Sequence, residues 1–432
     1  MTYESAVQYL YDLRWFGAKL GLENTHRLAA LAGNPQERLR FIHVAGTNGK
    51  GSTCAMLESI YRCAGLQVGL FTSPHLVHFS ERIQVNREPI PERDVVRLVE
   101  GMRPLVEQFG RDHHPTFFEV ATVMALSYFA EKACDVVVWE TGLGGRLDAT
   151  NIVHPLASVI TTIEFDHEKW LGSTLASIAL EKAGIIKPGV PVVTGVADTE
   201  PLEVIRQTAA TRQSPLHLVP LSGPEPSPLD GIELPLHGAH QRANARVALR
   251  TVEVLGSALP VSPDAVVRGF ESVYWPARLQ RIVRENGQVV VLDAAHNPSG
   301  AATLASAIRA EFAGARTCFI LGILQDKNYR EMCKLLAPLA GRILIAPVHS
   351  DRAATGAELA AACAAAKPGV SVRECPSLAE ALAATAPDET VVIAGSLYLA
   401  GEAMEILGIS NGGRKQERGL NEYGQYPKHT AR

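Results

Sequence analysis

The sequence predicts an α/β protein of two domains, each organised around a mostly parallel sheet. Between residues 39 and 195, short β-branched runs alternate with longer helical stretches, and a second series of the same kind begins near residue 279. A length of 432 residues suits two or three domains. We place the boundary near residues 274–277, so that residues 1–274 form the first domain and residues 275–410 form the second.

The elements of the first domain follow from hydrophobic periodicity. Runs of apolar and β-branched residues indicate buried strands, and longer stretches with apolar residues at helical spacing indicate helices. We predict strands at residues 40–45, 67–71, 135–140, 158–162 and 191–194, and helices at residues 50–64, 91–108, 117–132, 174–185 and 241–255. Residues 215–236 are proline-rich and irregular, so a loop is expected there.

The second domain opens on two strand patterns that flank Glu285-Asn286-Gly287, which is a hairpin signal. The alanine-rich residues 353–366 are expected to form a helix, because alanine has the highest helix propensity and Pro368-Gly369 supplies a stop. Residues 411–432 are polar, lack periodicity and are expected to be disordered. The predicted strands of this domain are residues 279–284, 288–292, 317–321, 342–346, 371–374 and 390–394.

Composition and charge exclude several classes of protein. With 41 basic and 45 acidic residues the net charge is −4, which lacks the basic excess of proteins that bind nucleic acid or anionic membranes. No apolar run approaches the ~18 residues of a membrane span, and the first residues do not resemble an export signal. Seven scattered cysteines without C-x-x-C spacing indicate reduced thiols. We therefore expect a cytoplasmic protein that binds neither nucleic acid nor membrane.

A phosphate-binding loop is the strongest local feature. A buried-strand pattern at residues 41–45 runs into Gly46-Thr47-Asn48-Gly49-Lys50-Gly51-Ser52 and then into a helix. Glycines let the backbone approach a phosphate, the helix N-terminus attracts negative charge, and Lys50 adds a cation. The loop differs from the ordinary P-loop motif, because Val44 replaces the first glycine and Gly51 separates Lys50 from the hydroxyl of Ser52.

A second glycine-rich segment, Gly142-Leu143-Gly144-Gly145-Arg146-Leu147, also follows a strand. It begins like the dinucleotide-binding fingerprint, but Leu147 stands where that motif needs a glycine for close helix packing. A nicotinamide or flavin site is therefore not expected here.

Acidic and imidazole side chains follow strands on the same predicted edge of the sheet. Glu140 ends the apolar run 136–139, where it could bind Mg²⁺, cap a helix or pair with Arg146. His167 ends the run that begins at Ile160 and follows two acidic residues, although it could also be a core histidine. Lys182 lies near the end of a helix, and its spacing alone suggests only that it complements the helix dipole.

With these motifs in order, the chain resembles the folylpolyglutamate synthase and dihydrofolate synthase family of the Mur ligase superfamily. The resemblance covers residues 20–401 and adds further motifs to the phosphate loop. These are Thr72-Ser73-Pro74-His75-Leu76, Glu81-Arg82-Ile83, residues 142–151, Glu181-Lys182-Ala183-Gly184, His240-Gln241, Asp293-Ala294-Ala295-His296-Asn297-Pro298 and Gly395-Ser396-Leu397-Tyr398. It implies an N-terminal P-loop ATPase domain followed by a smaller, Rossmann-like glutamate-ligase domain.

The resemblance implies roles for residues around ATP. Thr47, Asn48, Gly49, Lys50, Gly51 and Ser52 would hold the phosphates, and Asn244, Arg278 and Asp293 would also contact ATP. Ser73, Glu140 and His167 would bind Mg²⁺, with His167 also counted among the catalytic residues. Lys182 would be carbamylated, which turns a cation into a carboxylate ligand for a second metal. Two Mg²⁺ ions and a monovalent cation such as K⁺ are the cofactors that this resemblance implies.

The same resemblance assigns the substrate-binding residues. The pterin or folate would be held by three segments: Lys19, Leu20 and Gly21; Thr116, Phe117, Phe118 and Glu119; and Leu147, Asp148 and Ala149. The two phenylalanines suit a flat heterocycle and equally suit a core-facing helix start. His296 and Ser396 would bind L-glutamate. The partners implied are ATP, L-glutamate and either dihydropteroate or reduced folates, acted on by a monomer.

The implied reaction is the ATP-dependent ligation of L-glutamate to dihydropteroate, to the γ-carboxylate of folylpolyglutamates, or to both, through an acyl phosphate. Two alternatives stay open. Another amino-acid ligase of the Mur superfamily would share the phosphate loop, although the segments around Ser73 and Arg146 look folate-type. A P-loop phosphotransferase would not need the second domain. A single sequence does not decide whether one or both folate activities are present.

Overall fold

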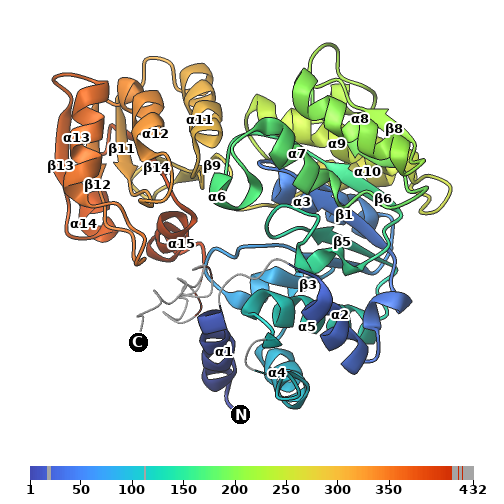
Figure 1. Ribbon diagram of the computed structural model, residues 1–432. Helices are drawn as coiled ribbons and strands as arrows, with labels where there is room; N and C mark the ends of the chain where they lie inside the picture. The colour runs from blue at the N-terminus through green and yellow to red at the C-terminus, as the bar shows by residue number, and fades with distance from the viewer. Residues whose placement is uncertain (17–20, 111–112, 411–416, 418–420, 422–432) are drawn as a thin grey trace. The chain divides into compact units, whose positions relative to one another are not determined.

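The computed structural model describes residues 1–16, 21–110, 113–410, 417 and 421, which form two compact units (Figure 1). Unit 1 contains Met1–Pro235 and Gln241–Tyr274, together with Glu417 and Asn421. Among the described residues, unit 2 contains Leu236–His240 and residues 275–410. Each unit is an α/β structure around its own mostly parallel sheet, which confirms the predicted fold class.

Unit 1 begins with two helices and then alternates strands and helices. Its helices are α1 (Tyr3–Asp12), α2 (Glu23–Leu31), α3 (Lys50–Cys63), α4 (Glu92–Val106), α5 (Phe117–Glu131), α6 (Glu168–Leu171), α7 (Leu175–Ala183), α8 (Thr199–Thr211), α9 (Ala239–Val254) and α10 (Pro263–Glu271). Its strands are β1 (Phe41–Ala45), β2 (Val68–Phe71), β3 (Ile83–Val85), β4 (Glu88–Pro89), β5 (Val136–Glu140), β6 (Ala157–Ile160), β7 (Val192–Thr194) and β8 (Leu216–Leu218).

The sheet of unit 1 places β1 between β5 and β6. The strand order is β4-β3-β2-β5-β1-β6-β7-β8. Strand β3 pairs antiparallel with both β2 and β4, and the remaining neighbours pair parallel. Val44 pairs with Glu140 of β5, and Ala45 pairs with Ile160 of β6. Because parallel strands end at one edge, the segments that follow β1, β5 and β6 meet there, at the kind of position where α/β proteins bind ligands.

Helices cover both faces of this sheet. Phe41, Phe71, Val137 and Trp139 point to one face and join the core that α1, α2, α4 and α5 complete. Their neighbours along the strands, such as Ile42 and Leu70, are also fully buried and point to the other face. Helix α3 packs on β2, β5 and α10. A sheet buried on both faces explains why its strands are continuous apolar runs.

Unit 2 repeats the α/β alternation on a smaller scale. Its sheet has the order β13-β12-β11-β14-β10-β9, and only β9 runs antiparallel to its neighbour. Its strands are β9 (Gln280–Val283), β10 (Val289–Leu292), β11 (Thr317–Leu321), β12 (Arg342–Ile345), β13 (Ser371–Glu374) and β14 (Thr390–Ala394). Its helices are α11 (Pro298–Glu311), α12 (Tyr329–Leu336), α13 (Gly356–Ala366), α14 (Leu378–Ala383) and α15 (Leu397–Ile406).

The structure corrects one sequence expectation and limits another. Residues 215–236 are not wholly a loop, because β8 adds a strand at Leu216–Leu218 to the edge of the sheet beside β7. Most of residues 411–432, which were expected to be disordered, lie outside the described residues. Two residues of that tail are described, and both are tied to unit 1: Glu417 is buried and Asn421 is hydrogen-bonded to Arg82. Across the part of the chain described here, no helix has the length and apolar character needed to cross a membrane.

Candidate active site

The phosphate loop connects the carboxyl end of β1 to the first turn of α3. Gly49 is the N-cap of α3 and has φ +82°, a backbone conformation that favours glycine. A Cβ at Gly46 would collide with the Thr161 side chain, and one at Gly49 would collide with the side-chain oxygen of Asn244. The loop is therefore closely packed against the end of β6 on one side and α9 on the other, and Asn244 of α9 lies beside it.

Residues after β6 fix the conformation of the phosphate loop. The amide of Thr47 donates to the Thr162 carbonyl oxygen (2.8 Å), and the Asn48 amide donates to the Thr162 hydroxyl (3.0 Å). The Asn48 side-chain amide donates to the Glu164 carboxylate (2.5 Å), whose own backbone amide donates to the Thr47 hydroxyl (3.1 Å). Neither Thr162 nor Glu164 was predicted to belong to the site. Their position at a strand end beside β1 is the signal that could have identified them.

Two lysines converge on one carbonyl oxygen of this loop. Lys50 Nζ donates to the Gly46 carbonyl oxygen at 3.1 Å, and Lys182 Nζ donates to the same oxygen at 2.8 Å. Lys182 comes from α7 and is 4% exposed. Burial, together with the nearby charge of Lys50, lowers the pKa of Lys182 to about 7. Lys182 thus lies in the phosphate site and does not act simply as a charge at a helix end.

The predicted metal ligands are only partly brought together. The Ser73 amide donates to Glu140 Oε2 at 3.0 Å, and Glu140 is 4% exposed at the end of β5. His167 follows β6 with φ +53° and caps α6, and its imidazole lies 3.9 Å from the Asp166 carboxylate. Within the described residues, no three His, Cys, Asp or Glu side chains are grouped so that they could hold a metal. Ser73 and Glu140 therefore form the clearer part of this candidate site.

The glycine-rich segment after β5 packs against the helix that carries Lys182. A Cβ at Gly145 would meet the carbonyl oxygens of Glu181 and Lys182, so only glycine allows this close approach. The Arg146 amide donates to the Glu181 carbonyl oxygen, and its guanidinium pairs with the Glu181 carboxylate at 2.7 Å. An ion pair with Arg146 was one of the alternatives for Glu140. The structure favours this alternative less, because Arg146 pairs with Glu181.

Asp148 is a buried organising carboxylate in the same segment, between the predicted folate residues Leu147 and Ala149. It accepts hydrogen bonds from the amides of Leu143 (2.7 Å) and Thr150 (3.0 Å). Burial raises the pKa of Asp148, although these hydrogen bonds oppose the rise. The Thr150 hydroxyl also lies 3.0 Å from Nε2 of the fully buried His43 on β1. The contacts of Asp148 and Thr150 thus link the glycine-rich segment after β5 to His43 on β1.

The other predicted folate residues lie at the start of α5 and just before α2. Thr116 and Glu119 form a capping box for α5, which gives both a structural role. Phe117 packs beside Phe79, with ring centroids 6.2 Å apart. A Cβ at Gly142 would meet Phe118, so Phe118 lies against the glycine-rich segment that contains Asp148. Gly21 is described, with φ +147°, whereas Lys19 and Leu20 lie outside the described residues.

In unit 2, Arg278 and Asp293 belong to one local cluster near the start of the sheet. Asp293 follows β10 and accepts hydrogen bonds from the amides of Leu279 (2.7 Å) and Ala295 (2.8 Å). Burial raises the pKa of the Asp293 carboxyl, and the Arg278 guanidinium opposes that rise. Burial also lowers the pKa of His240. The Asp293 carboxylate opposes this shift, and the Arg278 guanidinium adds to it. His240 lies in one of the family motifs, but no role was predicted for it.

The predicted glutamate residues follow two adjacent strands of unit 2. His296 follows β10, and its Nδ1 lies 3.0 Å from the Ala294 carbonyl oxygen, which fixes a proton on that nitrogen. Ser396 is fully buried and caps α15, where its hydroxyl accepts from the Leu399 amide (3.1 Å). The Gly395 amide donates to the Ala295 carbonyl oxygen, which joins the two segments. The capping of α15 is an alternative role for Ser396.

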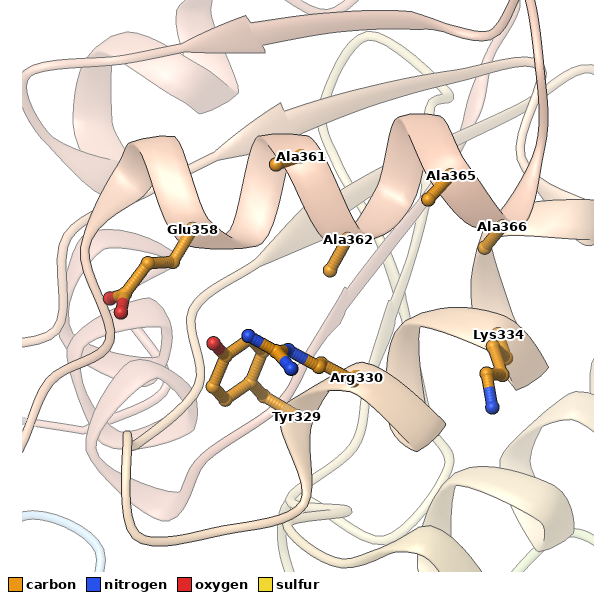
Figure 2. A pocket seen from close by; sticks show the side chains of 8 residues that line it. All are labelled: Tyr329, Arg330, Lys334, Glu358, Ala361, Ala362, Ala365 and Ala366. Atoms are coloured by element: carbon orange, nitrogen blue, oxygen red, sulfur yellow. The ribbon is translucent and has the colours of Figure 1, made fainter.

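A surface hollow of about 390 Å³ lies elsewhere in unit 2, between α12 and α13 (Figure 2). Alanines of α13 face Tyr329, Arg330 and Lys334 of α12 across it. None of the predicted site residues lines this hollow.

Comparison with known proteins agrees with this arrangement. Residues 277–397 match the family model described as "Mur ligase, glutamate ligase domain". The chain is 39% identical over 380 residues to the dihydrofolate synthase/folylpolyglutamate synthase of Bacillus subtilis, covering 83% of this chain and 88% of that relative. The structure of folylpolyglutamate synthase from Thermotoga maritima matches with a TM-score of 0.84 at 34% identity, covering 96% of this chain and 99% of the other.

A structure of the Escherichia coli FolC protein in complex with DHPP and ADP is also similar, with a TM-score of 0.83 and 32% identity over 95% of this chain and 98% of that chain. A phosphate-loop α/β unit followed by a Mur-type glutamate ligase domain defines an ATP-dependent ligase of the Mur class. More closely, the chain belongs to the folylpolyglutamate synthase/dihydrofolate synthase family. The resemblance found in the sequence is thereby confirmed.

Proposed function

We propose that this protein ligates L-glutamate to dihydropteroate and to the γ-carboxylate of folylpolyglutamates, at the expense of ATP. The observation that carries the proposal is the phosphate loop with Lys50 and Lys182 on one carbonyl oxygen, beside the edge where Glu140 ends β5. Relatives that carry the names of both activities, and a similar structure with DHPP and ADP, support the choice of substrates. A simple P-loop phosphotransferase would leave the glutamate ligase domain without a role.

The residues around Glu140 suit Mg²⁺. Glu140 is a buried carboxylate that ends β5 next to the phosphate loop, and it accepts a hydrogen bond from the Ser73 amide. Carboxylate and hydroxyl oxygens are ligands that Mg²⁺ accepts, so Ser73 and Glu140 are proposed to hold it. The family resemblance adds the imidazole of His167 as a third proposed ligand. A bound Mg²⁺ would neutralise charge on the phosphates during transfer. A second Mg²⁺ would require an oxygen ligand at Lys182, which carbamylation supplies, and K⁺ is the proposed monovalent cofactor.

The chemistry starts from a carboxylate, which is a poor electrophile. Its oxygen attacks the γ-phosphorus of ATP, the bond to the β-phosphate oxygen breaks, and an acyl phosphate and ADP form. The free amine of L-glutamate then attacks the acyl carbon, inorganic phosphate leaves, and the nitrogen loses a proton to give the amide. Lys50 would offset the charge on the transferred phosphoryl group, and the packed glycine loops would limit the access of water to the acyl phosphate.

Arg278 and Asp293 are proposed to contact ATP together with Asn244, and His296 and Ser396 are proposed to bind glutamate. Phe117, Phe118 and Asp148 are proposed to hold the pterin. The seven cysteines are all free thiols, which suits a reducing compartment, and we propose a cytoplasmic monomer.

The direct test incubates purified protein with Mg-ATP, L-glutamate and either dihydropteroate or a reduced folate. Mass spectrometry should show each acceptor gaining one glutamate, with one ADP and one phosphate released per product. Extension of only one acceptor would restrict the proposal to one activity. Extension of an unrelated carboxylate and of neither folate would disprove the folate assignment and leave the ligase class.

A further inference from the structure

The loop that follows β2 links the candidate metal residues to the candidate acceptor site. It starts at Ser73, whose amide donates to Glu140, and it ends at Arg82. Within the loop, the Glu81 carboxylate gathers three consecutive backbone amides at 2.7–2.8 Å, those of Leu76, Val77 and His78. Both ends of the loop therefore matter for the proposed site, and the Glu81 carboxylate holds residues in its middle.

Arg82 ties the end of this loop to α5. It is 3% exposed, its guanidinium carbon lies 5.3 Å from the centre of the Phe117 ring, and its Nε donates to His75 Nδ1 at 2.8 Å. Because His75 Nδ1 accepts this bond, its proton is on Nε2 and the ring is neutral. Burial and the neighbouring Arg82 lower the pKa of His75 well below its usual range, in agreement with that assignment.

Two residues from the C-terminal end of the chain complete the contacts of His75 and Arg82. His75 Nε2 donates to the Glu417 carbonyl oxygen at 2.7 Å. The Asn421 side chain makes two bonds: its oxygen accepts from Arg82 (2.7 Å), and its nitrogen donates to the His75 carbonyl oxygen (2.9 Å). Asn421 thus bridges one residue near the start of the loop and the residue at its end.

The carboxylate of Glu417 is also buried, at 1% exposure, and it holds the middle of the loop. Its Oε1 accepts from the Tyr3 hydroxyl of α1 (2.6 Å) and from the Phe79 amide (3.3 Å), and Oε2 lies 3.4 Å from His78 Nδ1. A buried carboxylate is stable only with such partners, so the side-chain oxygens of Glu417 are held by hydrogen bonds to α1 and to the loop.

We propose that Glu417 and Asn421 are positioning residues for the acceptor site. They hold the loop of residues 73–82 in the conformation that sets Ser73 beside Glu140 and Arg82 beside the Phe117 ring. This inference rests on the proposed function for the roles of Ser73 and Phe117, whereas the docking of the C-terminal residues on the loop stands on its own contacts. Loss of these contacts would free the loop and weaken acceptor binding more than glutamate binding.

The test compares full-length variants Asn421→Ala, Glu417→Ala and Glu417→Gln with the control Glu285→Gln, an exposed residue of the unit 2 hairpin. Hydrogen–deuterium exchange of peptides covering residues 73–82 measures the docking, and steady-state kinetics measure KM for acceptor and glutamate. We expect faster exchange in this loop alone and an acceptor KM raised about tenfold for Asn421→Ala and Glu417→Ala. Glu417→Gln keeps an oxygen acceptor and should recover most of the wild-type KM.

Unchanged exchange in the loop for both alanine variants would overturn the docking. Faster exchange throughout unit 1 with a lowered melting temperature, or equal rises in KM for acceptor and glutamate, would indicate a merely structural role and would overturn the positioning assignment. A wild-type protein that extends no folate acceptor would disprove the proposed function, and with it the acceptor role, while the exchange data would still decide whether the C-terminal residues hold the loop.

Discussion

Lys182 and Lys50 are two like charges that donate to one backbone oxygen, the Gly46 carbonyl. Burial disfavours the positive charge of Lys182 and the like charge of Lys50 adds to the effect, so the pKa of Lys182 falls to about 7. A neutral amine is the form of lysine that reacts with carbon dioxide. The environment of Lys182 is therefore suited to the carbamylation that we propose, although its spacing along α7 gave no such indication.

Replacing Lys182 with alanine should reduce turnover by at least about 100-fold, because the proposed carbamate is a metal ligand in the phosphate site. Short carboxylic acids added to the Lys182→Ala protein should restore part of the activity by supplying the missing oxygen ligand. The measurement is the initial rate of ADP release with and without acetate. Lys187→Ala is the control, since Lys187 donates to the Asn151 carbonyl oxygen outside the phosphate loop and acetate should not affect it. Full activity of Lys182→Ala would contradict the carbamate role.

Glu140→Gln isolates the charge of the proposed magnesium ligand, because glutamine keeps an oxygen that can accept from the Ser73 amide. We expect the fold to be retained, the concentration of Mg²⁺ at half-maximal rate to rise, and the maximal rate to fall by about 100-fold. Initial rates across a Mg²⁺ titration would measure both effects, with the exposed Glu131→Gln as the matched control. An unaltered Mg²⁺ dependence would remove Glu140 from the metal site.

His43 gives unit 1 a dependence of stability on pH. Burial lowers its pKa to about 3 in the folded protein, against about 6.5 in an unfolded chain. Below pH 6.5 the unfolded chain binds a proton that the folded protein does not, so the free energy of unfolding falls by about 1.4 kcal/mol per pH unit. Between pH 6.5 and 5 the loss is about 2 kcal/mol.

Thermal unfolding at pH 7.5 and pH 5.0 tests this effect. Between pH 7.5 and pH 5.0, the melting temperature of the wild type should fall by several degrees more than that of His43→Gln. The glutamine amide can still reach Thr150, but it does not titrate. Equal losses in the two proteins would show that His43 contributes nothing to the pH dependence.

At the scale of elements, the two ends of α3 offer a matched pair of glycines. Gly49 at the N-cap has φ +82°, and Gly65 beyond the C-terminal end has φ +87°, so alanine is similarly strained at both, by about 1 kcal/mol. The surroundings differ, because a Cβ at Gly49 would collide with Asn244 whereas a Cβ at Gly65 would meet nothing within 4 Å. A difference between the two variants therefore reports the collision in the phosphate loop rather than backbone strain.

We expect Gly49→Ala to weaken ATP binding at least about tenfold and Gly65→Ala to leave it unchanged. Both variants should lose about 1 kcal/mol of stability to backbone strain, and Gly49→Ala should lose more because its Cβ collides with the Asn244 side chain. Titration with a fluorescent ATP analogue and thermal unfolding would measure the two properties. If both variants bound the nucleotide equally well, the close packing of Gly49 would have no part in the site.

The elements most visible in the sequence are those with long apolar runs. The predicted strands at residues 135–140 and 317–321 match β5 (Val136–Glu140) and β11 (Thr317–Leu321) to within one residue, because parallel strands buried on both faces leave an uninterrupted signal. Strand β8 was missed because it has three residues, none of them fully buried, within a proline-rich stretch. Short edge strands depend on the neighbour that they pair with, and one-dimensional periodicity does not record it.

At the scale of the whole molecule, contacts between distant parts of the chain were the least predictable. The order of the motifs indicated the phosphate loop and the two-unit fold. The pairing of β1 with β5 and β6 explains why Glu140 and the residues after β6 lie next to that loop. The contact of Glu417 with His75 joins residues 342 apart, and a polar tail carries no signal for it. Lys182 was assigned only through the family resemblance, because its pKa depends on burial that the sequence does not state.

The two units have separate sheets and separate hydrophobic cores. The residues proposed for ATP, however, belong to both, with Lys50 and Asn244 in unit 1 and Arg278 and Asp293 in unit 2. A bound ligand slows local opening around the residues that it contacts, because binding stabilises the conformations that it requires. We therefore expect a non-hydrolysable ATP analogue with Mg²⁺ to slow hydrogen–deuterium exchange after β1 in unit 1 and after β10 in unit 2.

Arg278→Ala separates the two contributions. In this variant the analogue should still protect the phosphate loop of unit 1, while protection of residues 293–297 should be lost and the nucleotide affinity should fall about tenfold. Peptides from α13, which carries none of the proposed site residues, serve as the internal control. Protection confined to unit 1 in the wild-type protein would show that Arg278 and Asp293 take no part in binding ATP.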